Sequence, residues 1–363
     1  MDKAVDILSS RERLRGGLDA PQRPARVKRN IMNMSGSDET PAVLIEGLTK
    51  RYGRTLALDK VSFDVKRGEL FALLGPNGAG KTTMLHILCT ILRADEGRAQ
   101  INGVDIAKDP LGARLNIGVV FQEPSLDDRL TCVENLNFHG LVYGVPAYAR
   151  AKRIEQMLAV VELSDWRDRL VRTLSSGMKR RLEIARALVH DSRILFLDEP
   201  TVGLDAQARD RMWSYIRQLR EQHGLTVVVT THYIEEVEGC DRVCVIDHGK
   251  VLAIDTPAAL KARHGQELLR VTPRDAAAGA EIAADYADRI VRHDGEIVLR
   301  SDGDAFVEAL FNKYGPRIRR LAVEEPSLES VFLSLTGREL RDQAASARDV
   351  TYAFGKRGGE HTK

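Results

Sequence analysis

The sequence predicts an α/β fold with a mainly parallel sheet, an antiparallel β edge and a helical subdomain, followed by a small C-terminal α+β domain. Short apolar runs alternate with helical patterns along the middle of the 363-residue chain, as they do when helices cover a parallel sheet. A helical block from about residue 123 to 173 interrupts that alternation. Beyond residue 262 a shorter set of strand and helix patterns begins.

The predicted strands of the larger domain begin near Ala42. Residues 43–46 and 61–65 predict two antiparallel strands, joined through a turn that contains Tyr52. Further apolar runs predict buried parallel strands, at residues 69–74, 117–121, 194–197, 225–229 and 243–246. Thr131 and Glu134 have the spacing of a capping box, which predicts the start of the first helix in the helical block.

The C-terminal domain is predicted from its own run of elements. Strands are expected at residues 268–271 and 318–323, helices at 276–286 and 305–314, and a hairpin around Asp294-Gly295. The predicted domains are a disordered basic extension at 1–40, the main domain at 41–262, the small domain at 263–340 and a flexible tail at 341–363. Translation from Met32 or Met34 is an alternative to the extension.

Composition excludes several classes of protein. Lys plus Arg number 54 and Asp plus Glu 52, a net charge of +2, so no nucleic-acid footprint is expected over the whole chain. No apolar run approaches the roughly 18 to 20 residues that span a bilayer, and no signal-peptide core is present at the N-terminus. A cytoplasmic protein is expected. The sparse cysteines predict buried thiols rather than disulfides or a zinc site: Cys89, Cys132, Cys240 and Cys244.

Residues 75–83 fit the phosphate-binding loop pattern G-x-x-x-x-G-K-[ST] and lie between a predicted strand and a predicted helix. Glycines let the backbone N–H groups face an anion, and the helix N-terminus adds partial positive charge. Lys81 is expected to reach the β- and γ-phosphates, and the Thr82 hydroxyl to hold Mg²⁺. The predicted nucleotide-binding residues here are Gly75, Pro76, Asn77, Gly78, Ala79, Gly80, Lys81, Thr82 and Thr83.

Two acidic residues, Asp198 and Glu199, follow one of the buried apolar runs. A carboxylate at the end of a strand beside a phosphate loop can reach Mg²⁺, and the next carboxylate can orient a water and accept its proton. Gln122 and His232 also come directly after predicted strands. Each of these two is weak alone, but a γ-phosphate site needs polar groups from neighbouring strand ends.

These motifs resemble, in their order, those of the ATP-binding subunits of ABC transporters. The phosphate loop is followed by Gln122, Leu174-Ser175-Ser176-Gly177-Met178, Asp198-Glu199-Pro200, Gly203-Leu204-Asp205 and His232. The resemblance covers about residues 42–262. It implies a P-loop ABC-type nucleotide-binding domain that uses ATP and Mg²⁺.

The resemblance also implies a role for each matching residue. Tyr52 would stack on adenine, and Glu199 would be the general base. Gln122 would approach the metal and the attacking water, and His232 would contact the γ-phosphate. The implied metal ligands are Thr82, Gln122 and Asp198.

The family pattern further implies a head-to-tail homodimer with two ATP molecules between the protomers. Ser175, Ser176 and Gly177 would then face the nucleotide of the other subunit, and Asp205 would act at the dimer interface. The usual motif is Leu-Ser-Gly-Gly-Gln, so Ser176 and Met178 depart from it. If the backbone at residue 176 requires a positive φ, a residue other than glycine costs about 1 kcal/mol there.

The C-terminal residues 325–333 and 336–338 resemble the end of daunorubicin-resistance-type exporter subunits, which pair with a separate integral-membrane permease. This implies drug or antibiotic-type efflux by an ATPase on the inner face of the cell membrane, with no direct nucleic-acid partner. The alternatives are an accessory domain of another kind, a soluble ABC-type ATPase that acts on nucleic acid or ribosomes, and a regulatory module without turnover. The last is disfavoured by the presence of both Glu199 and His232.

Overall fold

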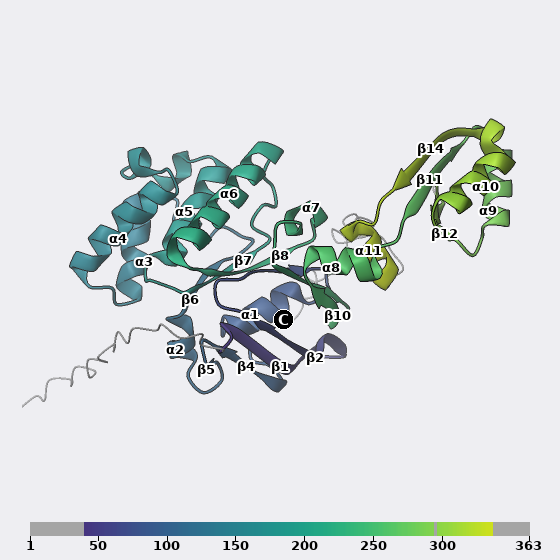
Figure 1. Ribbon diagram of the computed structural model, residues 1–363. Coiled ribbons are helices and arrows are strands. Elements are labelled where there is room, and N and C mark those ends of the chain that lie inside the picture. Colours follow the sequence, from purple (N-terminus) through teal and green to yellow (C-terminus); the bar gives the residue numbers. More distant parts are fainter. Residues whose placement is uncertain (1–39, 294–295, 337–363) are drawn as a thin grey trace, which may run out of the picture. The chain divides into compact units, whose positions relative to one another are not determined.

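The computed structural model describes residues 40–293 and 296–336. The predicted N-terminal extension up to residue 39, the Asp294-Gly295 turn and the predicted tail at 341–363 lie outside the described residues. Within the described part the strands form three sheets, with six strands in one sheet and four in each of the others (Figure 1).

The six-stranded sheet has the order β10-β9-β3-β8-β7-β6. Its neighbours pair in parallel except for β10, which is antiparallel to β9. The predicted parallel sheet is therefore confirmed, because each apolar run forms one of these strands. The five predicted strands are β3 (Leu70–Leu74), β6 (Ile117–Val120), β7 (Ile194–Asp198), β8 (Thr226–Thr231) and β9 (Arg242–Asp247). The sixth, β10 (Lys250–Asp255), was not predicted.

The predicted antiparallel edge is also confirmed. In this second sheet Val43 pairs with Val65 and Ile101 lies opposite Val43 on the other side. The sheet has the order β2-β1-β4-β5. Its strands are β1 (Val43–Tyr52), β2 (Thr55–Val65), β4 (Glu96–Ile101) and β5 (Val104–Asp105).

Strand β3 separates two hydrophobic cores, because its side chains point alternately to opposite faces. Leu70 and Leu74 belong to a core shared with the helices, whereas Phe71 and Leu73 belong to a core shared with the antiparallel sheet and α1 (Lys81–Leu88). Both faces of the parallel sheet are thus covered, and polar groups can gather at the carboxyl ends of its strands. The helices of the first core include α3 (Cys132–Val142), α4 (Ala147–Val160), α5 (Ser176–Leu188) and α6 (Ala206–His223).

The helical block opens as predicted. Thr131 accepts a hydrogen bond from the backbone N–H of Glu134 at 3.3 Å, and the Glu134 carboxylate accepts the N–H of Thr131 at 2.8 Å. This capping box satisfies two N–H groups at the start of α3. The remaining short helical segments of the larger domain are α2 (Pro110–Arg114), Ser164–Trp166, Val171–Thr173, α7 (Ile234–Val237) and α8 (Pro257–His264).

The third sheet is antiparallel and has the order β12-β13-β11-β14. Its chain order, strand-helix-strand-strand-helix-strand, is that of a ferredoxin-like unit. The strands and helices predicted for the small α+β domain are confirmed. They are β11 (Leu268–Pro273), α9 (Ala276–Asp285), β12 (Ile290–His293), β13 (Ile297–Arg300), α10 (Asp304–Tyr314) and β14 (Ile318–Glu324), with a 3₁₀ turn at Gly315–Arg317.

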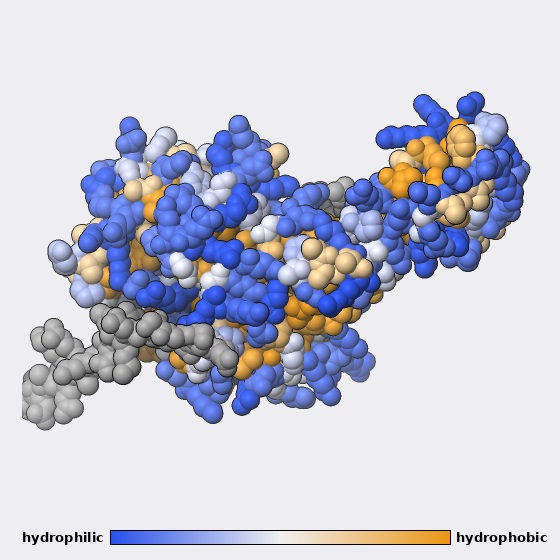
Figure 2. All heavy atoms as spheres, in the orientation of Figure 1, coloured by the Kyte–Doolittle hydropathy of each residue, from blue (hydrophilic) through white to orange (hydrophobic). Residues whose placement is uncertain are grey.

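The last described helix, α11 (Leu328–Thr336), packs on α8. Its Leu328, Val331 and Phe332 belong to the core of the helical face, whereas the ferredoxin-like sheet has a separate core. The predicted boundary at 263–340 stays a prediction. Most of the surface visible in Figure 2 is hydrophilic. No helix in the described ranges is long and apolar enough to cross a bilayer.

Candidate nucleotide site

The phosphate loop joins β3 to α1, as the sequence predicts. Gly78 and Gly80 have φ values of 81° and 104°, a region that favours glycine. A Cβ atom on Gly80 would also lie 2.5 Å from the carbonyl oxygen of Ala57. The loop therefore depends on glycine both for its backbone conformation and for its close approach to β2.

Lys81 is buried at the start of α1, and its Nζ donates to the carbonyl oxygens of Gly75 at 2.7 Å and Pro76 at 3.2 Å. The same Nζ lies 3.3 Å from Oε1 of Glu199. His232 Nδ1 lies 3.3 Å from that oxygen too, as an ion-pair contact, although Nδ1 has no well-aligned hydrogen-bond partner among the described residues. Glu199 thus sits between two groups that can carry positive charge.

Asp198 ends β7 with its carboxylate directed at the phosphate loop. Oδ1 accepts a hydrogen bond from the Thr82 hydroxyl at 3.4 Å and another from the Thr230 hydroxyl at 2.5 Å. Asp198 is almost fully buried. Two neighbouring strands, β7 and β8, therefore fix a carboxylate against the first turn of α1.

The electrostatics favour an ionised Glu199. Burial would raise the pKa of its carboxyl group, but the neighbouring His232 and the charge of Lys81 outweigh burial and hold that pKa below its usual value. Burial lowers the pKa of Lys81, and the adjacent Glu199 opposes this effect. Because Glu199 is ionised at neutral pH, it can accept a proton.

Glu199 also has an unusual backbone conformation. Its φ is 45°, in the left-handed region, which costs roughly 1 to 3 kcal/mol for a residue other than glycine. Its N–H donates to the backbone oxygen of Thr230 at 3.1 Å and to the Thr230 hydroxyl at 3.0 Å. Such strain persists only where surrounding contacts impose it, and it concentrates at functional sites.

Most of the predicted residues of this site line one pocket of about 700 Å³, whereas Gly75, Ala79 and Asp198 are not part of its lining. It brings together the phosphate loop, Tyr52 from the end of β1, Gln122 from the loop after β6, and Glu199 with His232. Tyr52 and Gln122 are exposed. The structure thus gathers, at one edge of the parallel sheet, side chains that lie far apart in the sequence.

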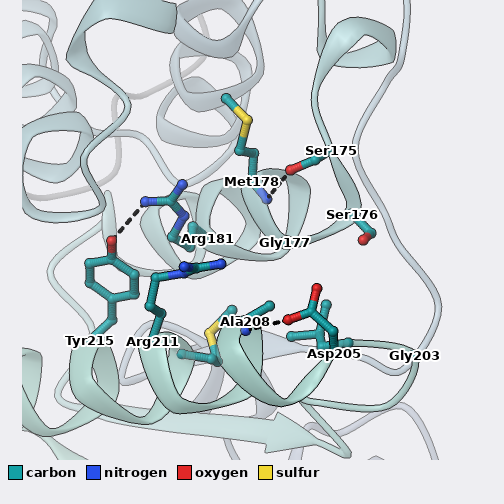
Figure 3. A pocket seen from close by; sticks show the side chains of 12 residues that line it. Ser175, Ser176, Gly177, Met178, Arg181, Gly203, Asp205, Ala208, Arg211 and Tyr215 are labelled. Atoms are coloured by element: carbon teal, nitrogen blue, oxygen red, sulfur yellow. Dashed lines mark hydrogen bonds between the residues drawn. The ribbon is translucent and has the colours of Figure 1, made fainter.

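The predicted residues Ser175, Ser176, Gly177 and Asp205 do not line that pocket. They line a second cavity of about 180 Å³ between the starts of α5 and α6, shown in Figure 3. Ser175 caps α5 by accepting from Met178 N–H at 3.3 Å, and Asp205 caps α6 by accepting from Ala208 N–H at 2.7 Å. Both caps leave helix N-termini facing this cavity.

Ser176 is not strained. It is the first residue of α5 and is absent from the described residues with positive φ. The condition under which serine would be unfavourable at this position is therefore not met. The first turn of a helix accepts serine without the penalty of a left-handed backbone.

Sequence reasoning did not single out Arg180, Thr230, Val202 or Tyr233. Val202 and Tyr233 line the larger pocket, and Thr230 bonds to Asp198 and Glu199. The position of Thr230 two residues before His232 was a usable signal. Arg180 offered none, because the atoms it contacts are mostly backbone carbonyl oxygens.

Comparison with known proteins identifies the family of this chain. The family model described as ABC transporter matches residues 58–202. The chain is 41% identical over 315 residues to the Nod factor export ATP-binding protein I of Ralstonia nicotianae, covering 85% of this chain and 97% of that protein. It is 37% identical to the daunorubicin/doxorubicin resistance ATP-binding protein of Streptomyces peucetius, and the match covers 84% of this chain and 95% of that protein.

Solved structures are similar over the larger domain. The cbiO1 subunit from Clostridium perfringens, part of an ABC transporter complex, matches with a TM-score of 0.58 and 30% identity over 61% of this chain and 91% of that chain. A dimeric ATP-binding cassette bound to ADP and Pi matches with a TM-score of 0.53 and 30% identity, over 59% of this chain and 98% of that chain.

The fold and the phosphate loop define a P-loop ATPase with a helical subdomain. The relatives narrow this class: the chain belongs to the ATP-binding subunits of ABC transporters. It is an ATPase, as this family and its structural neighbours are.

Proposed function

We propose that this chain hydrolyses ATP with Glu199 as the general base and drives export through a separate membrane permease. The contact that supports this most directly is the position of the Glu199 carboxylate, 3.3 Å from Lys81 Nζ and 3.3 Å from His232 Nδ1. Lys81 binds the β- and γ-phosphates. Glu199 takes a proton from the attacking water, and His232 and Gln122 orient the γ-phosphate and that water.

The remaining contacts of the nucleotide follow from the lining of the larger pocket. Tyr52 stacks on the adenine ring from the outer rim. The N–H groups of the phosphate loop and the N-terminus of α1 bind the phosphate oxygens. Lys81 exchanges its present acceptors, the carbonyl oxygens of Gly75 and Pro76, for phosphate oxygens.

The oxygen groups near the loop fit Mg²⁺. The Thr82 hydroxyl and the Asp198 carboxylate lie 3.4 Å apart, and Gln122, which carries an amide oxygen, lines the same pocket as Thr82. Hydroxyl, carboxylate and amide oxygens are the ligands that Mg²⁺ accepts. We assign Thr82, Asp198 and Gln122 to it, and when bound the ion neutralises charge on the β- and γ-phosphates.

The second cavity suggests a head-to-tail homodimer. The first residues of α5 line this cavity, and a helix N-terminus is suited to an anion. We infer that Ser175, Ser176 and Gly177 close on the γ-phosphate held by the other subunit, with Asp205 at the interface. One of the structural neighbours is itself a dimer bound to ADP and Pi.

A mixing experiment tests the composite site. Lys81→Ala removes the phosphate ligand of a subunit, and Gly177→Asp places a carboxylate where the partner's phosphate is expected. A Cβ at Gly177 meets only Ala208 Cβ at 3.9 Å, so the fold tolerates a side chain there. Each variant alone is expected to be inactive, whereas a mixture regains turnover through one intact composite site. A mixture without activity, from two folded variants that still associate with ATP, contradicts the composite site.

The permease is proposed to bind the helical lobe. Exposed apolar side chains gather on α3 and at the start of α4, where solvent exposure is 63% for Phe138, 66% for Val142 and 85% for Tyr148. Exposed apolar groups of this kind mark interaction surfaces. Docking there would hold the chain on the cytoplasmic face of the membrane, and closure of the ATP-bound dimer would move the permease.

The transported molecule is proposed from the relatives. Their names include export of Nod factor, resistance to daunorubicin and doxorubicin, and resistance to linearmycin in Bacillus subtilis. We infer efflux of a drug- or antibiotic-type molecule. Cells that express this chain with its permease should tolerate a higher concentration of such a compound, and cells with Lys81→Ala in the same chain should not.

A further inference from the structure

Arg180 lies inside the larger domain, only 7% exposed, although it is a charged residue in the second turn of α5. A buried guanidinium is unfavourable unless its N–H groups are paired and hydrogen-bonded. Here they are. Arg180 forms an ion pair with Glu183, which is itself 1% exposed, at 3.0 Å between Nη1 and Oε2.

The other acceptors of Arg180 surround the proposed base. Its Nε donates to the carbonyl oxygen of Pro200 at 2.9 Å, and its Nη2 donates to those of Asp198 at 3.0 Å and Glu199 at 3.4 Å. These are three consecutive carbonyl groups around the left-handed backbone of Glu199. Thr230 holds the Glu199 N–H from the other side. The contacts therefore impose the strained conformation in which the Glu199 carboxylate faces Lys81.

The same guanidinium also holds the loop that carries Gln122. Its Nη1 donates to the carbonyl oxygen of Phe121, the residue directly before Gln122. Glu183, the ion-pair partner, accepts the backbone N–H of Ser125 at 2.8 Å, three residues after Gln122. Arg186, one turn further along α5, donates to the Ser125 backbone and hydroxyl oxygens. One face of α5 thus fixes both ends of the Gln122 loop.

We propose that Arg180 is a positioning residue, which sets Gln122 and Glu199 relative to each other and links both to the helix that carries Ser175 and Gly177. Movement of α5 on nucleotide closure would then be transmitted directly to the base and to the water-orienting loop. This inference rests on the proposed roles of Glu199 and Gln122. Arg180 itself is not among the residues that line the larger pocket, and it contacts that lining through the backbone of Glu199.

The test compares Arg180→Lys with the unmodified full-length chain. Lysine keeps the charge beside Glu183 but cannot reach carbonyl groups on two loops from one planar head group. We expect kcat for ATP to fall by about 10- to 100-fold, because small misplacements of catalytic groups have effects of this size. The affinity for ATP, measured by equilibrium binding, should change less than about threefold, since the phosphate loop keeps its contacts.

Arg242→Lys is the matched control. Arg242 is a partly buried arginine that, like Arg180, bonds to carboxylate and backbone carbonyl groups. Its carboxylate partners are Glu69 and Asp64. It contacts neither the Gln122 loop nor residues 198–200. This variant should keep its kcat. If Arg180→Lys keeps its kcat as well, or loses ATP affinity in proportion to kcat, the positioning role is overturned. Should Arg180→Lys fail to fold, Glu183→Gln gives the same comparison from the other end of the ion pair.

A double-mutant cycle gives a readout that a merely structural role would not change. Gln122→Ala and Arg180→Lys should lower kcat by less together than the product of their separate effects, because both act through one loop. Fully multiplicative effects contradict the inference. Glu199→Gln, assayed alongside, separates the two proposals: if it keeps turnover, the assignment of the base fails, whatever Arg180→Lys does.

Discussion

His232 Nδ1 lies 3.3 Å from Oε1 of Glu199, so the residue directly after β8 contacts the residue directly after β7. The contact holds the carboxylate beside Lys81 and contributes to the lowered pKa of Glu199. It joins β7 to β8 at the edge of the sheet where the phosphate loop lies. The geometry of the base therefore depends on residues 33 positions apart in the chain.

The first prediction concerns His232→Ala. Removal of the imidazole frees the Glu199 carboxylate to leave its position beside Lys81 and removes the proposed γ-phosphate contact. We expect kcat to fall by about 100-fold and the KM for ATP to change by less than about fivefold. Steady-state ATPase assays measure both. An exposed histidine on α6, His223, provides the control, and His223→Ala should have normal kinetics. A normal kcat in His232→Ala would refute this role.

Ser176→Gly should have little effect. Ser176 is the first residue of α5 and has no positive φ, so glycine relieves no strain. Nucleotide binding and ATPase rate should stay within about twofold of the unmodified chain, and stability should fall by at most about 1 kcal/mol because glycine is more mobile when unfolded. ATPase assays and thermal unfolding check this. A tenfold loss of ATPase would contradict this prediction and would mean that the serine hydroxyl, and not only the backbone at residue 176, contacts the nucleotide of the other subunit.

Phe138→Asp should separate ATP hydrolysis from membrane attachment. Phe138 is exposed on α3 and lines neither pocket, so basal ATPase of the isolated chain should not change. A charge in the apolar surface should prevent docking on the permease. Sedimentation of the chain with permease-containing membranes measures this. Phe311→Asp, at a similarly exposed phenylalanine on α10, is the control. Equal membrane binding of all three proteins would exclude this surface.

Acid should destabilise the contact between α3 and the end of α5. Burial, with smaller contributions from Arg186 and His190, lowers the pKa of His139 to about 3, and burial also lowers the pKa of His190. The unfolded chain binds protons at these histidines near pH 6.5, whereas the folded chain does not. The free energy of unfolding therefore falls as pH drops below about 6.5, by up to about 1.4 kcal/mol per pH unit for each histidine.

Urea unfolding at pH 7.5 and 5.5 measures that loss. His139→Gln removes one titrating group and should have a shallower pH dependence than the unmodified chain. Exposed His223 serves again as the control, since His223→Gln should leave the slope unchanged. An identical slope in the His139 variant would contradict this prediction, because it would mean that the histidine binds protons equally in the folded and unfolded chains.

The larger domain was predictable because its signals are local. Apolar runs predicted the parallel strands that surround the site, and the spacing of Thr131 and Glu134 predicted a helix start. The phosphate loop was recognisable because its motif lies between a predicted strand and a predicted helix. Glu199 and His232 were predictable as strand-end residues. Their mutual contact depends on β7 and β8 being neighbours in the sheet. A prediction of parallel pairing does not fix which strands are neighbours.

Other features depend on tertiary contacts that no local pattern encodes. The role of Arg180 rests on carbonyl groups from residues 121 and 198–200, which only the folded chain brings together. The left-handed backbone of Glu199 has no sequence signal, because glutamate rarely adopts it. The ferredoxin-like strand order, and the packing of α11 on α8, depend on pairings that the α+β pattern left open.

The most direct test of the account is Glu199→Gln, measured for ATP turnover, ATP binding and association of subunits. The amide keeps the shape of the side chain but cannot accept a proton from water. We predict that turnover falls by at least about 100-fold, that ATP binding is retained, and that ATP converts the chain into a stable dimer detectable by sedimentation. Turnover near that of the unmodified chain would contradict the central claim that Glu199 is the base.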